Sequence, residues 1–168
     1  MEYQHITHPF GPLYDSSSRI LILGSLPSVK SREAAFFYGH PQNRFWPMLA
    51  DLLGEDRPET IEEKRQLALK HHIALWDTIY SCDIKGSSDS SIRNVIPTDL
   101  TPILKKAQIR RIFCNGKTSG AYYHKYQEQS LTIPATVLPS TSPANAAFRM
   151  EDLKHAWQVI LEELQAGT

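Results

Sequence analysis

The sequence predicts an α/β fold in which a parallel sheet carries helices on both faces. Short apolar runs that end at glycine or polar residues alternate along the chain with longer amphipathic segments, which is the pattern of strands joined by helical crossovers. The hydrophobic share is 41% and the charged share 21%, values typical of a globular protein. At 168 residues the chain can bury one core, so we expect a single domain over residues 1–168.

The first half of the chain predicts two strands and two helices. Residues 19–25 (RILILGS) form a short apolar run that ends in Gly-Ser and indicates a buried strand. Residues 43–53 have apolar side chains at helical spacing, and Pro47 suits a first helical turn. Residues 57–72 predict a second helix, with acids early and bases late as the helix dipole favours. Residues 73–80 (IALWDTIY) predict the second strand.

A polar segment separates this second strand from the next helix. Residues 81–94 are rich in serine and predict a functional loop. Residues 98–107 predict a helix that Thr98 or Asp99 caps. Residues 110–116 (RRIFCNG) predict a third strand that again ends at glycine.

The last third of the chain continues the alternation. We expect a helix over residues 117–129, a fourth strand over 132–140, a polar turn over 140–148 and an amphipathic closing helix over 150–165. Each polar segment, GSLPS, DTIYSCD, NGK and LPSTSPAN, follows the end of an expected strand. Because ligands bind at the carboxyl ends of parallel strands, these four loops are expected to surround one cleft.

Composition and charge exclude several classes of protein. The 18 basic and 18 acidic residues cancel, which argues against binding of nucleic acid by bulk electrostatics. No apolar run approaches the roughly 20 residues that a membrane span requires, and the N-terminus does not resemble a signal peptide. Cys82 and Cys114 have no metal or iron–sulfur spacing. We therefore expect an intracellular monomer without a membrane anchor, metal, iron–sulfur cluster or other cofactor.

Two proline-containing turns are candidate ligand contacts. In GSLPS, Gly24 allows close backbone approach and Pro27 fixes the turn, although a simple strand-to-helix connection explains the motif equally well. In LPSTSPANA, hydroxyl side chains lie between two prolines and suit contact with phosphate oxygens, and a capping turn is the structural alternative.

The segment FFYGHPQNRFW is the most specific stretch. Tyr38 lies next to the bend at Gly39 and is the candidate for stacking on a flat ligand such as a nucleobase. Phe45 and Trp46 are expected to anchor the following helix in the core. Arg44 is interpreted as an ordinary charge at a helix end.

Taken together, ILILGSLPS, FYGHPQNRFW, FCNGK and LPSTSPANA resemble the uracil-DNA glycosylase superfamily, in particular its mismatch-specific uracil and hypoxanthine (deoxyinosine) branches. The resemblance runs from about residue 19 to the final helix. It implies a three-layer α/β/α sandwich with a short, mainly parallel central sheet. It also implies hydrolysis of the N-glycosidic bond of a flipped nucleotide in base excision repair, on double-stranded DNA that contains a deaminated base.

The departures from the family pattern indicate the branch. Mismatch-specific members read Gly-x-Asn-Pro in the first motif, and their Asn helps to position the attacking water, where this chain has Leu26. The His or Asn before Pro-Ser in the second motif is Leu138 here. The chain resembles instead the hypoxanthine branch, whose catalytic residue is the Asn of the HPxN segment, which is Asn43 here.

The resemblance also implies roles for the other motif residues. The base would be bound by Gly24, Ser25, Leu26, Pro27, Tyr38, His40 and Asn115, and the DNA by Ser140, Thr141, Ser142 and Asn145. Asp77 follows the second strand into the same cleft, where it is either a further polar residue or a cap. Phe148 is a candidate for the wedge that fills the emptied base stack.

Other functions are compatible with these residues. One alternative is a G:U or G:T mismatch glycosylase with a modified catalytic set. Another is a relative with weak or lost catalysis that binds lesion DNA, which Leu26 favours. A third is a doubly wound domain that binds a small nucleotide, but the chain lacks a glycine-rich phosphate loop.

Overall fold

The computed structural model describes residues 2–165, and it divides the strands between two sheets. A four-stranded sheet contains β2 (Ile20–Gly24), β3 (Ile73–Asp77), β6 (Arg111–Asn115) and β7 (Ala135–Leu138). A three-stranded sheet contains β1 (Gln4–Thr7), β4 (Ile79–Ile84) and β5 (Arg93–Pro97). The helices are α1 (Val29–Ala34), α2 (Phe45–Leu53), α3 (Ile61–Lys70), α4 (Thr101–Lys106), α5 (Lys117–Tyr126), α6 (Glu128–Leu131), α7 (Met150–Trp157) and α8 (Val159–Gln165), with a short 3₁₀ turn at Asp89–Ser91.

The four-stranded sheet is parallel throughout and has the order β3-β2-β6-β7. The central strand β2 is buried along its whole length, as its continuous run of Ile and Leu predicts. The chain leaves β2 toward β3 on one side and continues from β6 toward β7 on the other. The order therefore reverses between β2 and β6, and a crevice at the carboxyl ends of these two strands is the expected ligand site.

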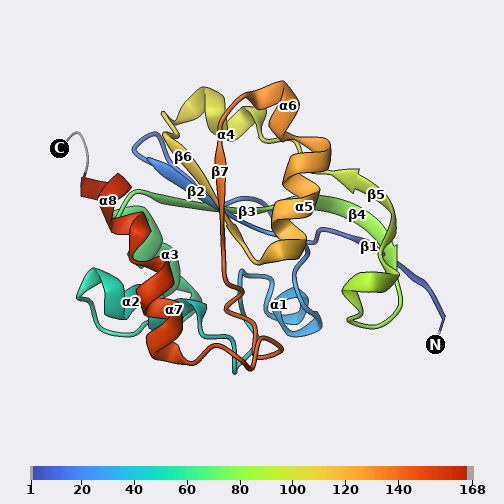
Figure 1. The fold of residues 1–168 in the computed structure, drawn as a ribbon, viewed down its shortest axis with the longest axis horizontal. Helices are drawn as coiled ribbons and strands as arrows, with labels where there is room; N and C mark the ends of the chain where they lie inside the picture. Colours follow the sequence, from blue (N-terminus) through green and yellow to red (C-terminus); the bar gives the residue numbers. More distant parts are fainter. Residues whose placement is uncertain (1, 166–168) are drawn as a thin grey trace.

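Helices cover both faces of this sheet, which confirms the predicted three-layer α/β/α arrangement (Figure 1). The helices α4, α5 and α6 lie on one side of the sheet, and α2, α3, α7 and α8 lie on the other. The main core lies between the layers and includes Phe45, Phe113 and Trp157, which are fully buried. No helix among residues 2–165 is long and apolar enough to cross a membrane.

The second sheet corrects the prediction for residues 73–94. The strand predicted over residues 73–80 divides at Thr78 into β3 and β4, which belong to different sheets. The predicted loop 81–94 contains the end of β4 and the start of β5, and only residues 85–92 connect them. Ile79, Cys82 and Ile84 build a small core of their own. The sequence did not predict this strand, because polar residues interrupt the alternation of its apolar side chains. The strand β1 was not predicted and pairs with β4.

The helices differ from the prediction at several points, and the predicted helix 117–129 divides at Gln127 into α5 and α6. The helix α1 was not predicted, and Ser28 caps it by accepting a hydrogen bond from the backbone N–H of Ser31. The closing helix divides at Gln158 into α7 and α8. Before α4, the Asp99 carboxylate accepts from the Thr101 N–H at 3.0 Å, whereas the Thr98 hydroxyl is buried and donates to the carbonyl of Asp77. Asp99 therefore makes the cap-like contact.

Candidate active site

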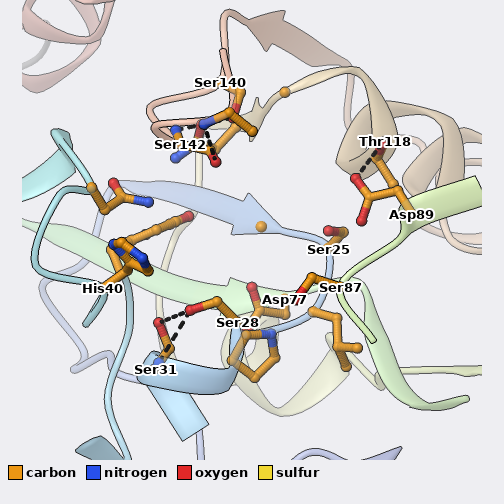
Figure 2. Close-up of a pocket in the computed structure, with 18 of the residues that line it drawn as sticks. Ser25, Ser28, Ser31, His40, Asp77, Ser87, Asp89, Thr118, Ser140 and Ser142 are labelled. Carbon is orange, nitrogen blue, oxygen red and sulfur yellow. Dashed lines mark hydrogen bonds between the residues drawn. The ribbon is translucent and has the colours of Figure 1, made fainter. Parts of the chain in front are cut away.

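A pocket of about 440 Å³ opens at the carboxyl ends of the parallel strands, where the order of the sheet reverses. The loops after β2, β6 and β7 contribute to its wall, as the sequence predicted, together with Asp77 at the end of β3 and the bend before α2. Figure 2 shows Ser25, His40, Asp77 and Ser142 around the same space, which they approach from distant parts of the chain. The volume lies within the range typical of small-molecule sites.

Asn43 lies in this pocket with a fixed orientation. Its Oδ1 accepts one hydrogen bond from the backbone N–H of Phe45 at 2.9 Å and another from the Thr141 hydroxyl at 2.8 Å. Because a backbone N–H can only donate, the atom that faces it must be the amide oxygen. The Nδ2 group donates to no atom of residues 2–165. The amide of Asn43 is therefore held by its oxygen and offers its two N–H donors to a ligand.

Thr141 connects Asn43 to the end of β6. Its backbone N–H donates to Asn115 Oδ1 at 3.0 Å, and its hydroxyl accepts from Asn115 Nδ2 at 3.0 Å. Thr141 is fully buried, and its hydroxyl and N–H are both occupied. The Thr141 hydroxyl is therefore engaged within the protein, where it positions Asn43, and its contact with the DNA backbone stays a prediction. Asn115 supports Thr141 while it also lines the pocket.

Arg44 fastens the 140–148 turn to the start of α2. Its guanidinium donates to four main-chain carbonyls of that turn, which belong to Thr141, Ser142, Asn145 and Phe148. The Arg44 backbone N–H adds a bond to the carbonyl of Thr141 at 3.1 Å. Arg44 is thus a clamp between two motifs and not an ordinary helix-end charge.

Tyr38 stands beside Asn43 on a strained bend. Its φ is +53°, in the left-handed region, and the next N–H, of Gly39, donates to the Ser31 hydroxyl at 2.8 Å. Its ring stacks on Phe45 with a centroid distance of 4.2 Å. Burial, and next the charge of Asp77, raises the pKa of the Tyr38 hydroxyl far above its usual range, so the group stays protonated.

Asp77 ends β3 in the pocket wall, and His8, which directly follows β1, lies beside it. The Asp77 side chain is 5% exposed, and its Oδ2 lies 2.6 Å from Nε2 of His8. Its Oδ1 lies against Gly24, where a Cβ would approach it to 2.4 Å. Gly24 thus permits the carboxylate to lie beside the backbone of β2.

Most of the residues that the sequence singled out converge on this pocket. Gly24, Ser25, Leu26, Pro27, Tyr38, His40, Asn43, Asn115, Ser140, Thr141 and Ser142 all line it. Asn145 does not, because its side-chain amide donates to the carbonyl of Ser140 within the turn. The structure gives Asn145 a role in shaping the loop, and its contact with DNA stays a prediction.

Several lining residues were not predicted. Gly86, Ser87 and Asp89, from the loop between β4 and β5, close one side of the pocket, and the Thr118 hydroxyl donates to Asp89. Arg32 and Lys117 add two cations to the lining. The serine-rich composition of residues 81–94 signalled this loop, whereas nothing in the sequence linked His8 to Asp77.

The donor set indicates hydrogen-bonding chemistry. Among residues 2–165, no group of three or more His, Cys, Asp or Glu side chains is arranged to hold a metal ion. Burial raises the pKa of the Cys114 thiol to about 11, so this neighbouring thiol is not a nucleophile at neutral pH. The site offers amide donors, hydroxyls, the carboxylates of Asp77 and Asp89, and an aromatic wall.

The chain is similar to known proteins over nearly its whole length. Residues 12–165 match the family model described as the uracil DNA glycosylase superfamily. A protein of Methanosarcina acetivorans named hypoxanthine DNA glycosylase is 32% identical over 157 residues, which cover 92% of this chain and 98% of the relative. A protein of the same name from Methanosarcina barkeri is 38% identical over 155 residues, which cover 88% of this chain and 93% of that relative.

A solved structure shares the architecture. The solution NMR structure of a Methanosarcina acetivorans protein assigned as a uracil DNA glycosylase superposes with a TM-score of 0.80 and 30% sequence identity. The match covers 93% of this chain and 96% of that one.

Proposed function

The chain belongs to the uracil DNA glycosylase superfamily, and we propose that it is a DNA glycosylase that releases hypoxanthine from deoxyinosine by hydrolysis of the N-glycosidic bond. The observation that carries this proposal is the fixed amide of Asn43, which presents its N–H donors to a pocket of the size that a flipped nucleobase requires. The names of the two Methanosarcina relatives support hypoxanthine as the base.

The target nucleotide must first leave the duplex. Flipping costs a few kcal/mol and costs least where the base is mispaired. Hypoxanthine opposite thymine, the product of adenine deamination, pairs poorly and opens readily. In the pocket, Tyr38 offers an aromatic wall, and the main chain at Gly24, Ser25 and Leu26 offers polar contacts to the base edge.

Asn43 then acts as a donor on the departing base. As the glycosidic bond breaks, the sugar gains positive charge and the base gains negative charge. Donors that already point at the base stabilise this charge without reorganisation. An amide does not titrate usefully, so Asn43 is not a general base. Since Oδ1 is occupied by Phe45 and Thr141, the Nδ2 hydrogens are the part of the amide that meets the substrate.

The rim of the pocket suits the DNA backbone beside the flipped nucleotide. Ser140 and Ser142 present hydroxyls there, and Arg32 and Lys117 supply positive charge. Few phosphate contacts are available on a chain of zero net charge. We therefore propose a monomer that acts on double-stranded DNA inside the cell and whose affinity depends weakly on salt.

One observation favours a second candidate, a lesion-binding relative with weak catalysis. Leu26 occupies the family position of the water-positioning residue, and it packs against the small core of Ile79, Cys82 and Ile84. The Leu26 side chain has no hydrogen-bonding group that could orient water. The proposed glycosylase must therefore draw its rate from the pocket and from Asn43.

The test is base release from labelled duplexes that carry a single deoxyinosine, deoxyuridine or deoxyxanthosine, with an undamaged duplex as control. Release of hypoxanthine at the highest rate supports the proposal. Fastest release of uracil would assign the protein to uracil or mismatch repair. Tight binding of the inosine duplex without release of any base would favour the lesion-binding relative.

A further inference from the structure

We propose that His8 and Asp77 form a buried pair that fixes one carboxylate oxygen at the base pocket as an acceptor, and that this oxygen selects bases that carry a ring N–H. This inference rests on the proposed glycosylase function and adds a rule for the substrate. Deamination turns N1 of adenine, an acceptor, into the N1–H donor of hypoxanthine. It changes N3 of cytosine into the N3–H of uracil in the same way. A fixed acceptor would therefore separate both deaminated bases from their parents.

The His8 ring is fixed in the core, and Asp77 is its hydrogen-bond partner. Its side chain is fully buried, and Nε2 lies 2.6 Å from Asp77 Oδ2. Trp76 lies at a centroid distance of 4.4 Å and Phe10 at 4.6 Å. The His8 backbone N–H donates to the carbonyl of Tyr80 at 2.7 Å, which ties the end of β1 to β4. The ring therefore cannot turn away from Asp77 without disturbing the core.

The hydrogen-bond partners of His8 define the direction of the bond. Nδ1 is buried and finds no partner among residues 2–165. A buried N–H without an acceptor costs more than a buried lone pair, so the proton belongs on Nε2. Nε2–H then donates to Asp77 Oδ2, which accepts.

The other carboxylate oxygen remains available to a ligand. Asp77 Oδ1 accepts no hydrogen bond from residues 2–165, and Asp77 lines the pocket. The main chain here is fixed, because the carbonyl of Asp77 accepts from the Thr98 hydroxyl at 2.6 Å and the N–H of Thr78 donates to the carbonyl of Gly24 at 2.9 Å. Figure 2 shows the Asp77 side chain directed into the space between Ser25 and His40.

A carboxylate reads the base differently from an amide. When ionised it accepts only, so it is attracted to a ring N–H and repelled by a bare ring nitrogen. A hydrogen bond to a charged group contributes enough to discriminate about 10- to 100-fold between such bases. Guanine also has an N1–H, so this oxygen rejects adenine and cytosine but not guanine.

The pair makes an unusual prediction for Asp77→Asn. Because the Nε2–H of His8 can only donate here, it will hold the amide oxygen of the new side chain. The NH₂ group must then face the pocket. The selecting group changes from an acceptor into a donor, and the preference should invert in favour of a purine with a bare N1.

The experiment compares duplexes with deoxyinosine and with 2′-deoxynebularine, whose purine has a bare N1. Single-turnover base release and equilibrium binding are measured for both duplexes. The variants are Asp77→Asn, His8→Leu and His8→Gln, which keeps an N–H donor. Asp83→Asn is the matched control, because Asp83 on β4 forms a more exposed carboxylate–histidine pair with His5 on β1 at 2.9 Å. Circular dichroism and thermal melting establish that each variant is folded.

We expect Asp77→Asn to lower the preference for deoxyinosine over deoxynebularine by about 10- to 100-fold. His8→Leu should lower it less, His8→Gln should restore it, and Asp83→Asn should leave it at the wild-type value. An unchanged ratio in Asp77→Asn, including an equal loss of rate on both duplexes, would overturn the inference. Wild-type protein that releases no base would refute the proposed function alone, and the ratio of the two Kd values would then decide the role of the pair.

Discussion

The hydroxyl of Thr141 donates a hydrogen bond to Oδ1 of Asn43 at 2.8 Å, across 98 positions of the chain. This bond joins the segment before α2 to the turn after β7. Together with the N–H of Phe45 it occupies the amide oxygen and turns the Nδ2 group toward the pocket. The two most distinctive sequence motifs are therefore one structural unit, and the first three predictions follow from that unit and from the pocket beside it.

Replacement of Thr141 by Val should slow base release without abolishing it. The substitution removes the hydroxyl that orients Asn43 and leaves the backbone bond to Asn115 in place. We expect a loss of about 1–2 kcal/mol in the free energy of unfolding, because two buried polar groups lose a partner. We expect a decrease of about tenfold in single-turnover rate, equivalent to about 1.4 kcal/mol. Thr141→Ser keeps the hydroxyl and should remain close to wild type. Equal rates for Val and Ser would show that the hydroxyl does not orient the amide.

Loss of the Arg44 guanidinium should release the 140–148 turn. Arg44→Met keeps the aliphatic stem but leaves four carbonyls without their donor. Since hydrogen bonds to charged groups contribute about 1.5–3 kcal/mol, a destabilisation of about 1–3 kcal/mol is expected. Limited proteolysis followed by mass spectrometry should detect faster cleavage within residues 140–148. Arg65→Met, on the exposed face of α3, is the control, and an unchanged cleavage pattern in Arg44→Met would contradict the clamp.

A methyl group at position 24 should damage the pocket. A Cβ on Gly24 would lie 2.4 Å from Asp77 Oδ1, which cannot retreat freely because His8 holds the other oxygen. We expect Gly24→Ala to reduce hypoxanthine release by more than about tenfold, or 1.4 kcal/mol of transition-state stabilisation. The control is Gly11→Ala, because nothing lies within 4 Å of a Cβ there. Equal activity of the two variants would mean that the carboxylate moves without consequence.

Acid should weaken the contact between α2 and α7. The hydrogen bond from Arg57, and next the one from Lys154, lowers the pKa of the Asp51 carboxyl in the folded protein. A group with a lowered folded pKa stabilises the fold above its unfolded pKa of about 3.9, and this stabilisation is lost as the pH falls through the folded value.

Urea unfolding at pH 7 and pH 3 tests this effect. At pH 7 the free energy of unfolding of the wild type should exceed that of Asp51→Asn by less than about 1 kcal/mol, as for a partly exposed ion pair. This difference in the free energy of unfolding should shrink at pH 3. Asp56→Asn is the control, because Asp56 makes no ion pair among residues 2–165. A difference that is constant with pH would assign the effect of Asp51→Asn to packing.

The sequence predicted the parts of the molecule that local patterns determine. The four parallel strands follow from their apolar runs, two of which end at a glycine, and the convergence of their loops follows from the geometry of parallel sheets. Asn43 was reached through the family resemblance. The second sheet was missed because Ile79, Cys82 and Ile84 are interrupted by polar residues and because β1 is only four residues long.

Long-range partners account for the other omissions. His8 and Asp77 are separated by 69 positions, and only the pairing of β1 with β4 brings them together. Arg44 has the sequence context of a helix-end charge, and its four acceptors are main-chain carbonyls that no sequence pattern reveals. Thr141 was assigned to the DNA because hydroxyls between prolines suggest exposure, whereas Asn115 and Asn43 enclose it.

The central claim is that Asn43 acts through the N–H donors of its amide, and the most direct test compares Asn43→Asp with Asn43→Ala in single-turnover release of hypoxanthine. Aspartate keeps an acceptor for Phe45 and Thr141 but has no N–H for the base. If the N–H donor is responsible for the rate, the single-turnover rate of both variants should decrease by about 100-fold or more, as is typical when a preorganised donor is removed. The alanine variant should still bind the inosine duplex. Aspartate that retains most of the wild-type rate while alanine loses it would contradict the account, because the oxygen and not the N–H would then be the working group.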